Sequence, residues 1–257
     1  IDADDNHGQS VAGVAAARGG NGIGGTGAAP YASIAGLNVY TADEANNTAK
    51  RALYVQAYYW KSGVDPLTGK ITAKPQINIM NHSYGQTTPF HVTDDLHGSD
   101  ITAALNRTTA NGIIHVWAAG NERGKANEDT GKDSVLTNSN VIAVAALGSD
   151  GKFSDYSNYG SNVFVTAPSS TDDGFGITTT DRTGTDLGYN RYSTENTHGD
   201  KSDLFPDTAY TSTFGGTSSS APLVSGILAL GMEANKLMDV RMAKHVLVRT
   251  STKIDSS

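Results

Sequence analysis

Cysteine is absent from the 257 residues, so stabilisation beyond the core must come from something other than disulfides. Long apolar runs are also absent. The longest, residues 221–232, is interrupted by Ser225 and Gly226 and is too short to span a bilayer. Positive charge is not in excess, because the net charge is −7, and this gives no reason to expect a nucleic acid or an anionic membrane as a partner. No signal peptide is recognisable and the chain begins at Ile1, so we expect a processed or trimmed chain.

The composition that remains is that of a folded domain. Charged residues make up 18% of the chain and hydrophobic residues 37%, which excludes a disordered chain. A length of 257 residues is enough for one large domain with a substantial core. The 29 glycines indicate many tight turns and close backbone approaches.

Short apolar runs alternate with helical patterns along the chain. The runs read as strands, several of them buried on both faces, and lie at Ser33–Val39, Gln76–His82, Ile113–Ala119, Val141–Ala146 and Val163–Thr166. The helical patterns lie at Ala42–Lys61, Asp100–Asn111, Leu223–Met232 and Val240–Thr250. This alternation predicts an α/β fold with a mostly parallel central sheet and helices on both faces. The active site of such a fold lies at the carboxyl ends of the strands.

One stretch breaks the alternation. Residues 182–213 are polar, without clear periodicity, and long for a loop in a compact domain. Such loops tend to be functional or mobile. Relative to the family that the motifs below resemble, this stretch would be an insertion that shapes access to a site or docks a neighbouring domain.

A serine-rich motif precedes the helix at 223–232. It reads Gly-Thr-Ser-Ser-Ser-Ala-Pro over residues 216–222. A serine at a helix start gains from free backbone amides and from the positive end of the helix dipole, and Gly216 lets a substrate approach closely. By itself, however, the motif favours an ordinary helix N-cap.

A histidine motif begins the chain. His7 follows Asp4, Asp5 and Asn6 and starts a helical pattern. A serine hydroxyl needs a neighbouring base, and histidine suits that role because its pKa lies near working pH. The alternative is an exposed histidine near a helix N-terminus. The other six histidines lack a comparable context, and we interpret them as structural or surface groups: His82, His91, His97, His115, His198 and His245.

The buried strand at 113–119 ends in Gly120-Asn121. An ordinary turn explains that pair equally well. In the functional interpretation, Asn121 donates its side-chain amide to the oxyanion of a tetrahedral intermediate, and the backbone amide of Ser218 is the second donor. Loss of one such donor typically lowers turnover by roughly 100- to 1,000-fold.

Together these motifs resemble the subtilases, the subtilisin-like serine proteases. Residues 216–222 resemble the family's nucleophile motif, residues 7–13 its histidine helix and residues 118–121 its oxyanion motif. The resemblance covers nearly the whole chain and leans towards the kexin and furin branch. It implies a subtilisin-like three-layer sandwich and a secreted, bacterial endopeptidase that cleaves proteins or peptides through an acyl-enzyme, with Ser218 as nucleophile and His7 as base.

The resemblance also implies a substrate-binding groove. One wall is an edge that would pair with the substrate as an antiparallel strand, formed by Ser83, Tyr84 and Gly85. The opposite wall is formed by Ala118, Ala119 and Gly120. Furin-like enzymes cut after paired basic residues, but here Gln86, Thr87 and Thr88 stand where furin has acids. Asp129 and Asp133 could still make the pocket negative, so cleavage after Lys or Arg is a hypothesis and a broad preference stays open.

Calcium is the cofactor that the resemblance implies. The first site would use the side chain of Asn21 and the carbonyl oxygens of Arg18, Ile23 and Gly25. The alternative is a plain turn. A second site would use Asp155, joined by Asp129 or Asp133.

One expected residue is missing. A subtilase carries an aspartate in an Asp-x-Gly motif some tens of residues before the histidine, and that residue orients the imidazole. Only six residues precede His7, and Asp2, Asp4 and Asp5 are too close. We therefore expect an N-terminal segment, and also a C-terminal β domain, a propeptide or a chaperone, as partners of this chain. The alternative is an inactive fragment or a module that binds peptides or a partner protein.

Overall fold

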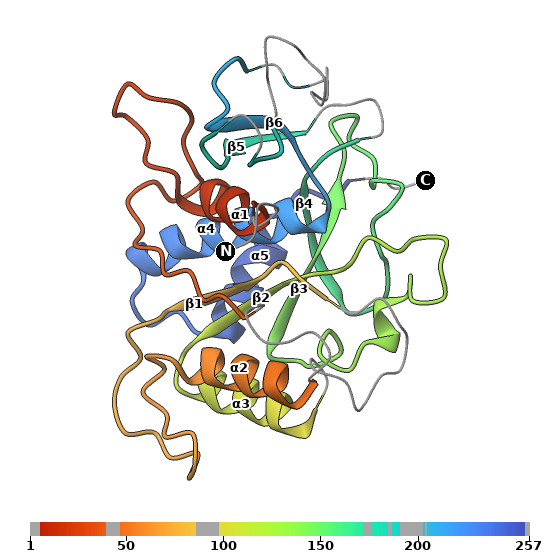
Figure 1. Ribbon diagram of the computed structural model, residues 1–257. Coiled ribbons are helices and arrows are strands. Elements are labelled where there is room, and N and C mark those ends of the chain that lie inside the picture. The colour runs from red at the N-terminus through yellow and green to blue at the C-terminus, as the bar shows by residue number, and fades with distance from the viewer. Residues whose placement is uncertain are drawn as a thin grey trace.

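The structure, a computed structural model, describes residues 6–39, 47–85, 98–171, 176–184, 187–190, 203 and 205–254 (Figure 1). Its helices are α1 (His7–Ala16), α2 (Asn47–Tyr59), α3 (Ser99–Ala110), α4 (Thr217–Ala234) and α5 (Val240–Thr250), with a 3₁₀ turn η1 (Thr130–Lys132). Its strands are β1 (Ile79–His82), β2 (Ile114–Ala118), β3 (Val141–Leu147), β4 (Val163–Pro168), β5 (Ile177–Thr180) and β6 (Tyr210–Phe214).

A four-stranded parallel sheet in the order β1-β2-β3-β4 forms the middle layer. Every residue of β2 is buried because helices cover both faces. Trp117 belongs to the apolar cluster shared with α2 and α3, whereas Val116 belongs to the cluster shared with α4 and α5 (Figure 1). Neighbouring residues of one strand thus serve opposite cores, as the two-residue repeat of a strand requires. The predicted α/β class and three-layer arrangement are confirmed.

The strand predicted at Ser33–Val39 is wrong. This segment is not a strand and pairs with no described strand, and its Ile34 and Leu37 side chains are 52% and 39% exposed. Apolar composition predicts β structure only where a partner strand satisfies the backbone hydrogen bonds. The strand predicted from Gln76 begins only at Ile79.

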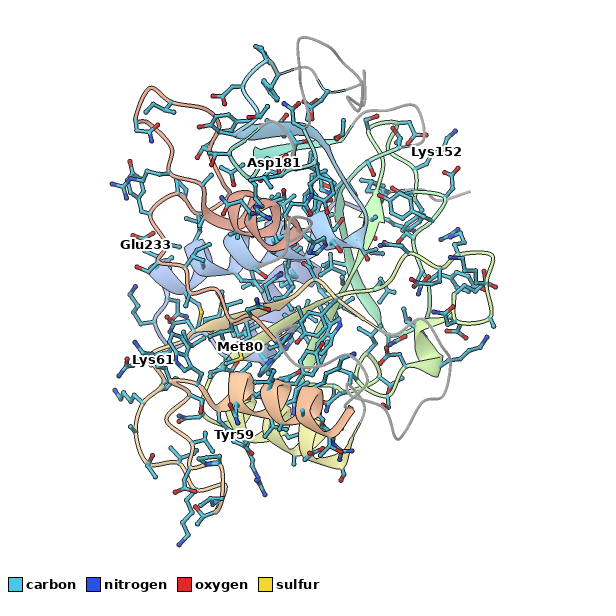
Figure 2. All side chains as sticks on the ribbon, viewed as in Figure 1. Tyr59, Lys61, Met80, Lys152, Asp181 and Glu233 are labelled. Carbon is cyan, nitrogen blue, oxygen red and sulfur yellow. The ribbon has the colours of Figure 1, made fainter. Side chains whose placement is uncertain are left out.

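The polar stretch 182–213 is not loop throughout. Its last residues enter β6, which pairs antiparallel with β5 as a two-stranded sheet beside α1 (Figure 1). Asp203 holds the start of β6, because its carboxylate accepts hydrogen bonds from the Thr211 hydroxyl at 2.6 Å and from the Ser212 hydroxyl at 3.0 Å. Asp181, labelled in Figure 2, directly follows β5 and is buried. The helix predicted over 42–61 is α2, and residues 42–46 lie outside the described residues.

Helix α1, which carries His7, is held against two other elements. Helix α1 packs against α4 and against β5 (Figure 1). Gly13 permits the close approach of α1 to β5, since a Cβ at this position would collide with the side chains of Thr179 and Thr180. The Thr179 hydroxyl donates to the Ser10 carbonyl oxygen at 2.8 Å and fixes α1 on β5. His7 starts α1 and Ser218 lies in the first turn of α4.

Candidate active site

Ser218 lies where a tight backbone turn leads into α4. Gly216 has φ +72°, a conformation that favours glycine, and α4 begins at the next residue. The Ser218 hydroxyl donates to the Ser83 carbonyl oxygen at 3.4 Å, and the Ser83 hydroxyl donates to the Ser218 carbonyl oxygen at 3.0 Å. The predicted nucleophile and the predicted substrate-binding edge therefore meet directly.

Asn121 is held next to the serine turn by its side-chain oxygen. This Oδ1 accepts hydrogen bonds from the Thr217 amide at 2.8 Å and from the Thr217 hydroxyl at 3.0 Å. Because Oδ1 is committed in this way, the amide group Nδ2 is the end left to donate to another acceptor. A Cβ at Gly216 would lie 3.0 Å from this Nδ2. Asn121 is thus placed beside Ser218 with a donor available, which is the arrangement an oxyanion hole requires.

The backbone around Asn121 is held by Asn158. The Asn158 side-chain oxygen accepts a hydrogen bond from the backbone amide of Glu122 at 2.7 Å, and the backbone amide of Asn158 donates to the Gly120 carbonyl oxygen at 3.0 Å. Glu122 in turn accepts from the Asn121 amide at 2.8 Å. Gly120 has φ +105°, and a Cβ there would collide with Asn158 and Glu122. The loop that carries Asn121 is therefore fixed on both sides.

His7 lies beside the strand that leads into the serine turn. Its ring contacts the ring of Phe214 edge-on, with centroids 5.6 Å apart and planes at 70°. Burial lowers the pKa of His7 below its ordinary value, so the ring is neutral and able to accept a proton near neutral pH. No carboxylate among the described residues contributes to this pKa. In this conformation the Ser218 hydroxyl bonds Ser83 and not His7.

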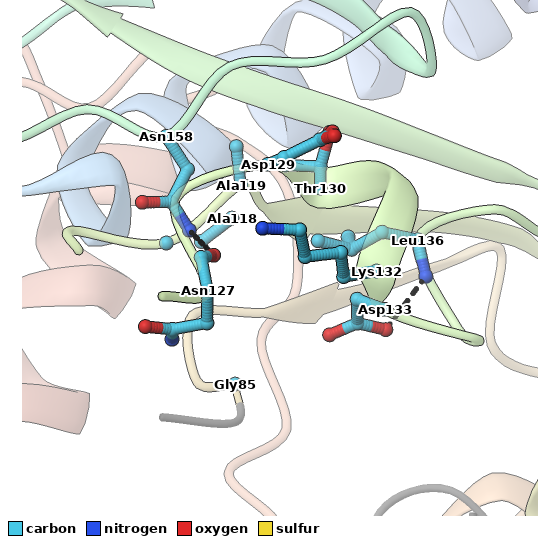
Figure 3. Close-up of a pocket in the computed structure, with 11 residues that line it drawn as sticks. Gly85, Ala118, Ala119, Asn127, Asp129, Thr130, Lys132, Asp133, Leu136 and Asn158 are labelled. Carbon is cyan, nitrogen blue, oxygen red and sulfur yellow. Dashed lines mark hydrogen bonds between the residues drawn. The ribbon is translucent and has the colours of Figure 1, made fainter. Parts of the chain in front are cut away.

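The two predicted walls enclose a pocket next to Ser218. It is lined by Tyr84, Gly85, Ala118, Gly120, Asn121, Glu122, Thr217 and Ser218. A second pocket continues behind the first between Gly85 and the strand end 118–120, and Ala119, Asn127, Asp129, Lys132, Asp133, Leu136 and Asn158 are among its lining residues (Figure 3). The groove residues that the sequence singled out are brought together.

The second pocket holds charges of both signs. Asp133 Oδ1 accepts from the amides of Val135 at 2.8 Å and Leu136 at 3.0 Å, and Asp129 Oδ1 accepts from the Gly131 amide at 2.8 Å. The Lys132 side chain reaches across this pocket (Figure 3), and its Nζ donates to the Ala126 carbonyl oxygen at 2.8 Å. Two carboxylates and one ammonium group leave the lining with a formal charge of −1.

Most of the predicted calcium ligands are exposed, whereas Asp129 and Asp133 of the second site are half-buried in the lining of the second pocket. Asn21 Oδ1 accepts from the Ile23 amide at 3.0 Å, which closes a turn in the loop after α1, where Arg18 and Gly25 are also exposed. Asp155 is exposed in the loop after β3. Across the part of the chain that the structure describes, no three His, Cys, Asp or Glu side chains gather as a metal cluster would require. Both calcium sites stay predictions.

The roles of three groups of site residues were not predicted from the sequence. Thr217 and Asn158 orient Asn121, yet a threonine beside a nucleophile and an asparagine in a loop carry no signal of their own. The serine at 83 was predicted as backbone wall only. His82 and His115 are buried, in agreement with a structural role, but nothing in the sequence indicated that His82 hydrogen-bonds Tyr84 of the pocket wall or that His115 hydrogen-bonds His82.

The fold is that of the subtilases. The model of the subtilase family matches residues 1–257, and the chain belongs to that family. It is similar to the "Aeromonas extracellular serine protease" of Aeromonas sobria, with 32% identity over 99% of this chain and 42% of the relative. It is also similar to a "Calcium-dependent protease" of Trichormus variabilis, with 29% identity over 98% of this chain and 36% of the relative.

A solved structure of a relative has the same fold. The crystal structure of the Aeromonas sobria serine protease in complex with its chaperone superimposes with a TM-score of 0.80 at 28% identity, over 100% of this chain and 45% of that one. The chain therefore spans less than half the length of these relatives. No described helix is both long and apolar enough to cross a membrane.

Proposed function

We propose that this chain carries the serine nucleophile, the base and the oxyanion donor of an endopeptidase that hydrolyses peptide bonds. One observation supports the proposal above all: Ser218, Asn121 and the edge at Tyr84 and Gly85 line a single pocket. Membership of the subtilase family agrees with it.

The reaction follows from what these groups can do. The Ser218 oxygen attacks the scissile carbonyl carbon while His7 takes the hydroxyl proton, and Asn121 Nδ2 with the Ser218 amide stabilises the oxyanion. Collapse of the tetrahedral intermediate breaks the C–N bond, and the amine leaves with the proton that His7 returns. Water then hydrolyses the acyl-enzyme by the same steps in reverse. A turn of the Ser218 side chain from Ser83 towards His7 starts the cycle.

The decisive test is covalent labelling of Ser218. A fluorophosphonate probe reacts with an activated serine, so the purified protein should carry the label on Ser218 and cleave a casein substrate. Ser218→Ala should abolish both signals, whereas Ser251→Ala, which removes an exposed serine hydroxyl after α5, should leave both unchanged. A protein that binds peptides but takes up no label would instead be a binding module.

The position of the carboxylate partner of His7 belongs to the same proposal. We place it outside the described residues, because burial alone acts on the pKa of His7 within them. A carboxylate hydrogen-bonded to the imidazole would orient the ring and raise its pKa. A search for a second, Asp-bearing segment in the intact active protein by mass spectrometry tests this assignment.

The second pocket suggests a preference for basic side chains. Asp129 and Asp133 would attract the Lys or Arg that precedes the scissile bond, and Lys132 would oppose it (Figure 3). The test compares two fluorogenic peptides that differ only in having Arg or Leu before the scissile bond. Lys132→Met should raise the ratio of kcat/KM for the Arg peptide to kcat/KM for the Leu peptide, and Asp129→Asn should lower this ratio. Equal ratios in both variants and the unchanged protein would favour a broad preference.

Calcium, secretion and a chaperone complete the proposal. The loop at Arg18, Asn21, Ile23 and Gly25 offers neutral oxygen donors, which suit calcium but need carboxylates from elsewhere. One relative is named as calcium-dependent, another as extracellular, and the solved structure is a complex with a chaperone. A fall in thermal midpoint on chelation, reversed by Ca²⁺ and not by Mg²⁺, would support the calcium site.

A further inference from the structure

Two histidines lie stacked in the core directly behind the substrate-binding edge. His115 is fully buried and His82 is 5% exposed. Their rings are 5.3 Å apart and inclined by only 18°, and His82 Nε2 lies 3.0 Å from His115 Nδ1. Tyr58 packs against both rings at 5.3 Å. Two polar rings are thus enclosed by aromatic side chains, and each ring nitrogen needs a partner.

Each free end of the pair has such a partner. At one end, His82 Nδ1 lies 2.8 Å from the hydroxyl of Tyr84. At the other end, His115 Nε2 lies 2.9 Å from the hydroxyl of Thr108 in α3. Thr108 also lies 2.8 Å from the carbonyl oxygen of Ala104 one turn earlier. Four side chains therefore form one hydrogen-bonded chain that runs from α3 to the pocket wall.

The Thr108 hydroxyl fixes the direction of this chain. It has a single hydrogen, which it donates to the Ala104 carbonyl oxygen, so it accepts from His115 Nε2–H. His115 Nδ1 then has no hydrogen and accepts from His82 Nε2–H. His82 Nδ1 in turn accepts from the Tyr84 hydroxyl. The order needs both rings neutral, and burial lowers the pKa of both, that of His115 to about 3.

The backbone of Tyr84 is also held by a residue that packs on His82. Its carbonyl oxygen accepts from Trp117 Nε1 at 2.6 Å, and Trp117 stacks on His82 with centroids 4.2 Å apart. Tyr84 lines the pocket beside Ser218. Ser83, which precedes it, exchanges hydrogen bonds with Ser218. A shift of Tyr84 would therefore move the edge that aligns a substrate with the nucleophile.

We propose that His82 and His115 are positioning residues that hold the substrate-binding edge at 83–85 through the Tyr84 hydroxyl. The inference rests on the proposed peptidase function. The pair touches no reacting atom, so it acts on how an extended peptide binds and not on the reactivity of Ser218. A loss confined to peptide binding is the signature that separates this role from a general role in stability.

The experiment compares peptide turnover with probe labelling. Tyr84→Phe removes one oxygen atom and breaks the hydrogen bond between His82 and the pocket wall. His115→Phe breaks the hydrogen bonds that join His82 to His115 and His115 to Thr108. Each should raise KM for a fluorogenic peptide about fivefold, as expected for one lost hydrogen bond, with kcat and the fluorophosphonate labelling rate within about twofold. In the double variant KM should rise no further than in the single variants. Tyr31→Phe, which removes a hydroxyl from an exposed tyrosine, is the matched control.

Two results would overturn the proposal. One is a KM for Tyr84→Phe within twofold of the unchanged protein, and this variant decides alone should His115→Phe fail to fold. The other is a labelling rate that falls in parallel with peptide turnover, which would mean a general loss of the site. Absence of labelling and turnover in the unchanged protein would refute the peptidase function itself and is distinguishable from both.

Discussion

Replacement of Thr217 by valine tests how Asn121 is oriented. The Thr217 side chain is fully buried, and its hydroxyl donates to Asn121 Oδ1 at 3.0 Å while accepting from the Gly120 amide at 3.0 Å. Valine has nearly the same shape, so no cavity forms, but both hydrogen bonds are lost. A buried amide left without its acceptor costs about 1–3 kcal/mol. We expect Thr217→Val to lower the free energy of unfolding by about this amount.

The effect on turnover follows from what remains. Asn121 Oδ1 keeps the hydrogen bond from the Thr217 amide at 2.8 Å, so the side chain loses one of two restraints. Complete loss of an oxyanion donor costs about 2.7–4 kcal/mol in activation free energy. Partial loss of its orientation should cost about 1.4 kcal/mol, which lowers kcat roughly tenfold. KM should change little, because Asn121 acts on the tetrahedral intermediate.

Steady-state kinetics with a fluorogenic peptide and urea unfolding measure the two quantities on the same preparation. Thr217→Ser keeps the hydroxyl and is the matched control, with kcat expected within about threefold of the unchanged protein. Asn121→Ala gives the decrease in kcat that follows complete loss of this oxyanion donor. The reasoning is refuted if Thr217→Val keeps its kcat within twofold, or if Thr217→Ser loses as much as Thr217→Val.

Three further predictions concern stability and pH. The pKa of His115 is lowered by burial from 6.5 to about 3, so between pH 7.5 and pH 5 the unfolded state binds a proton at His115 that the folded state does not. Urea unfolding should show a loss of stability over this range, of which His115 contributes about 2 kcal/mol, and His115→Phe should reduce the loss by about that amount while buried His82 keeps its own share. An unchanged loss in that variant would contradict this origin, and the exposed His245→Gln is its control. Gly13→Ala should lower the free energy of unfolding by several kcal/mol and the labelling rate with it, because a methyl group there collides with β5, whereas Gly8→Ala meets open space. The acidic limb of kcat/KM should lie within or above the ordinary range of histidine titration if a carboxylate outside the described residues raises the pKa of His7, and a limb below that range would mean that burial acts alone.

The local patterns predicted most of the elements because each depends on neighbouring residues. Continuous apolar runs predicted β2, β3 and β4, and the helical pattern at 240–250 predicted α5. The segment at 33–39 has the same composition but is not a strand, since pairing with another part of the chain decides that. The strand β6 was missed for the converse reason: its polar residues are paired with β5 and held by Asp203.

The site divides in the same way. His7, Asn121 and Ser218 stand in short motifs whose chemistry is readable from residue type and order, so the sequence alone indicated the family to which the chain belongs and the reaction class proposed for it. The tertiary structure decided which groups support them. Thr217, Asn158 and the pair formed by His82 and His115 act through hydrogen bonds between residues 33 to 97 positions apart. Such bonds depend on where the strands and helices pack, and no local pattern in the chain records that distance.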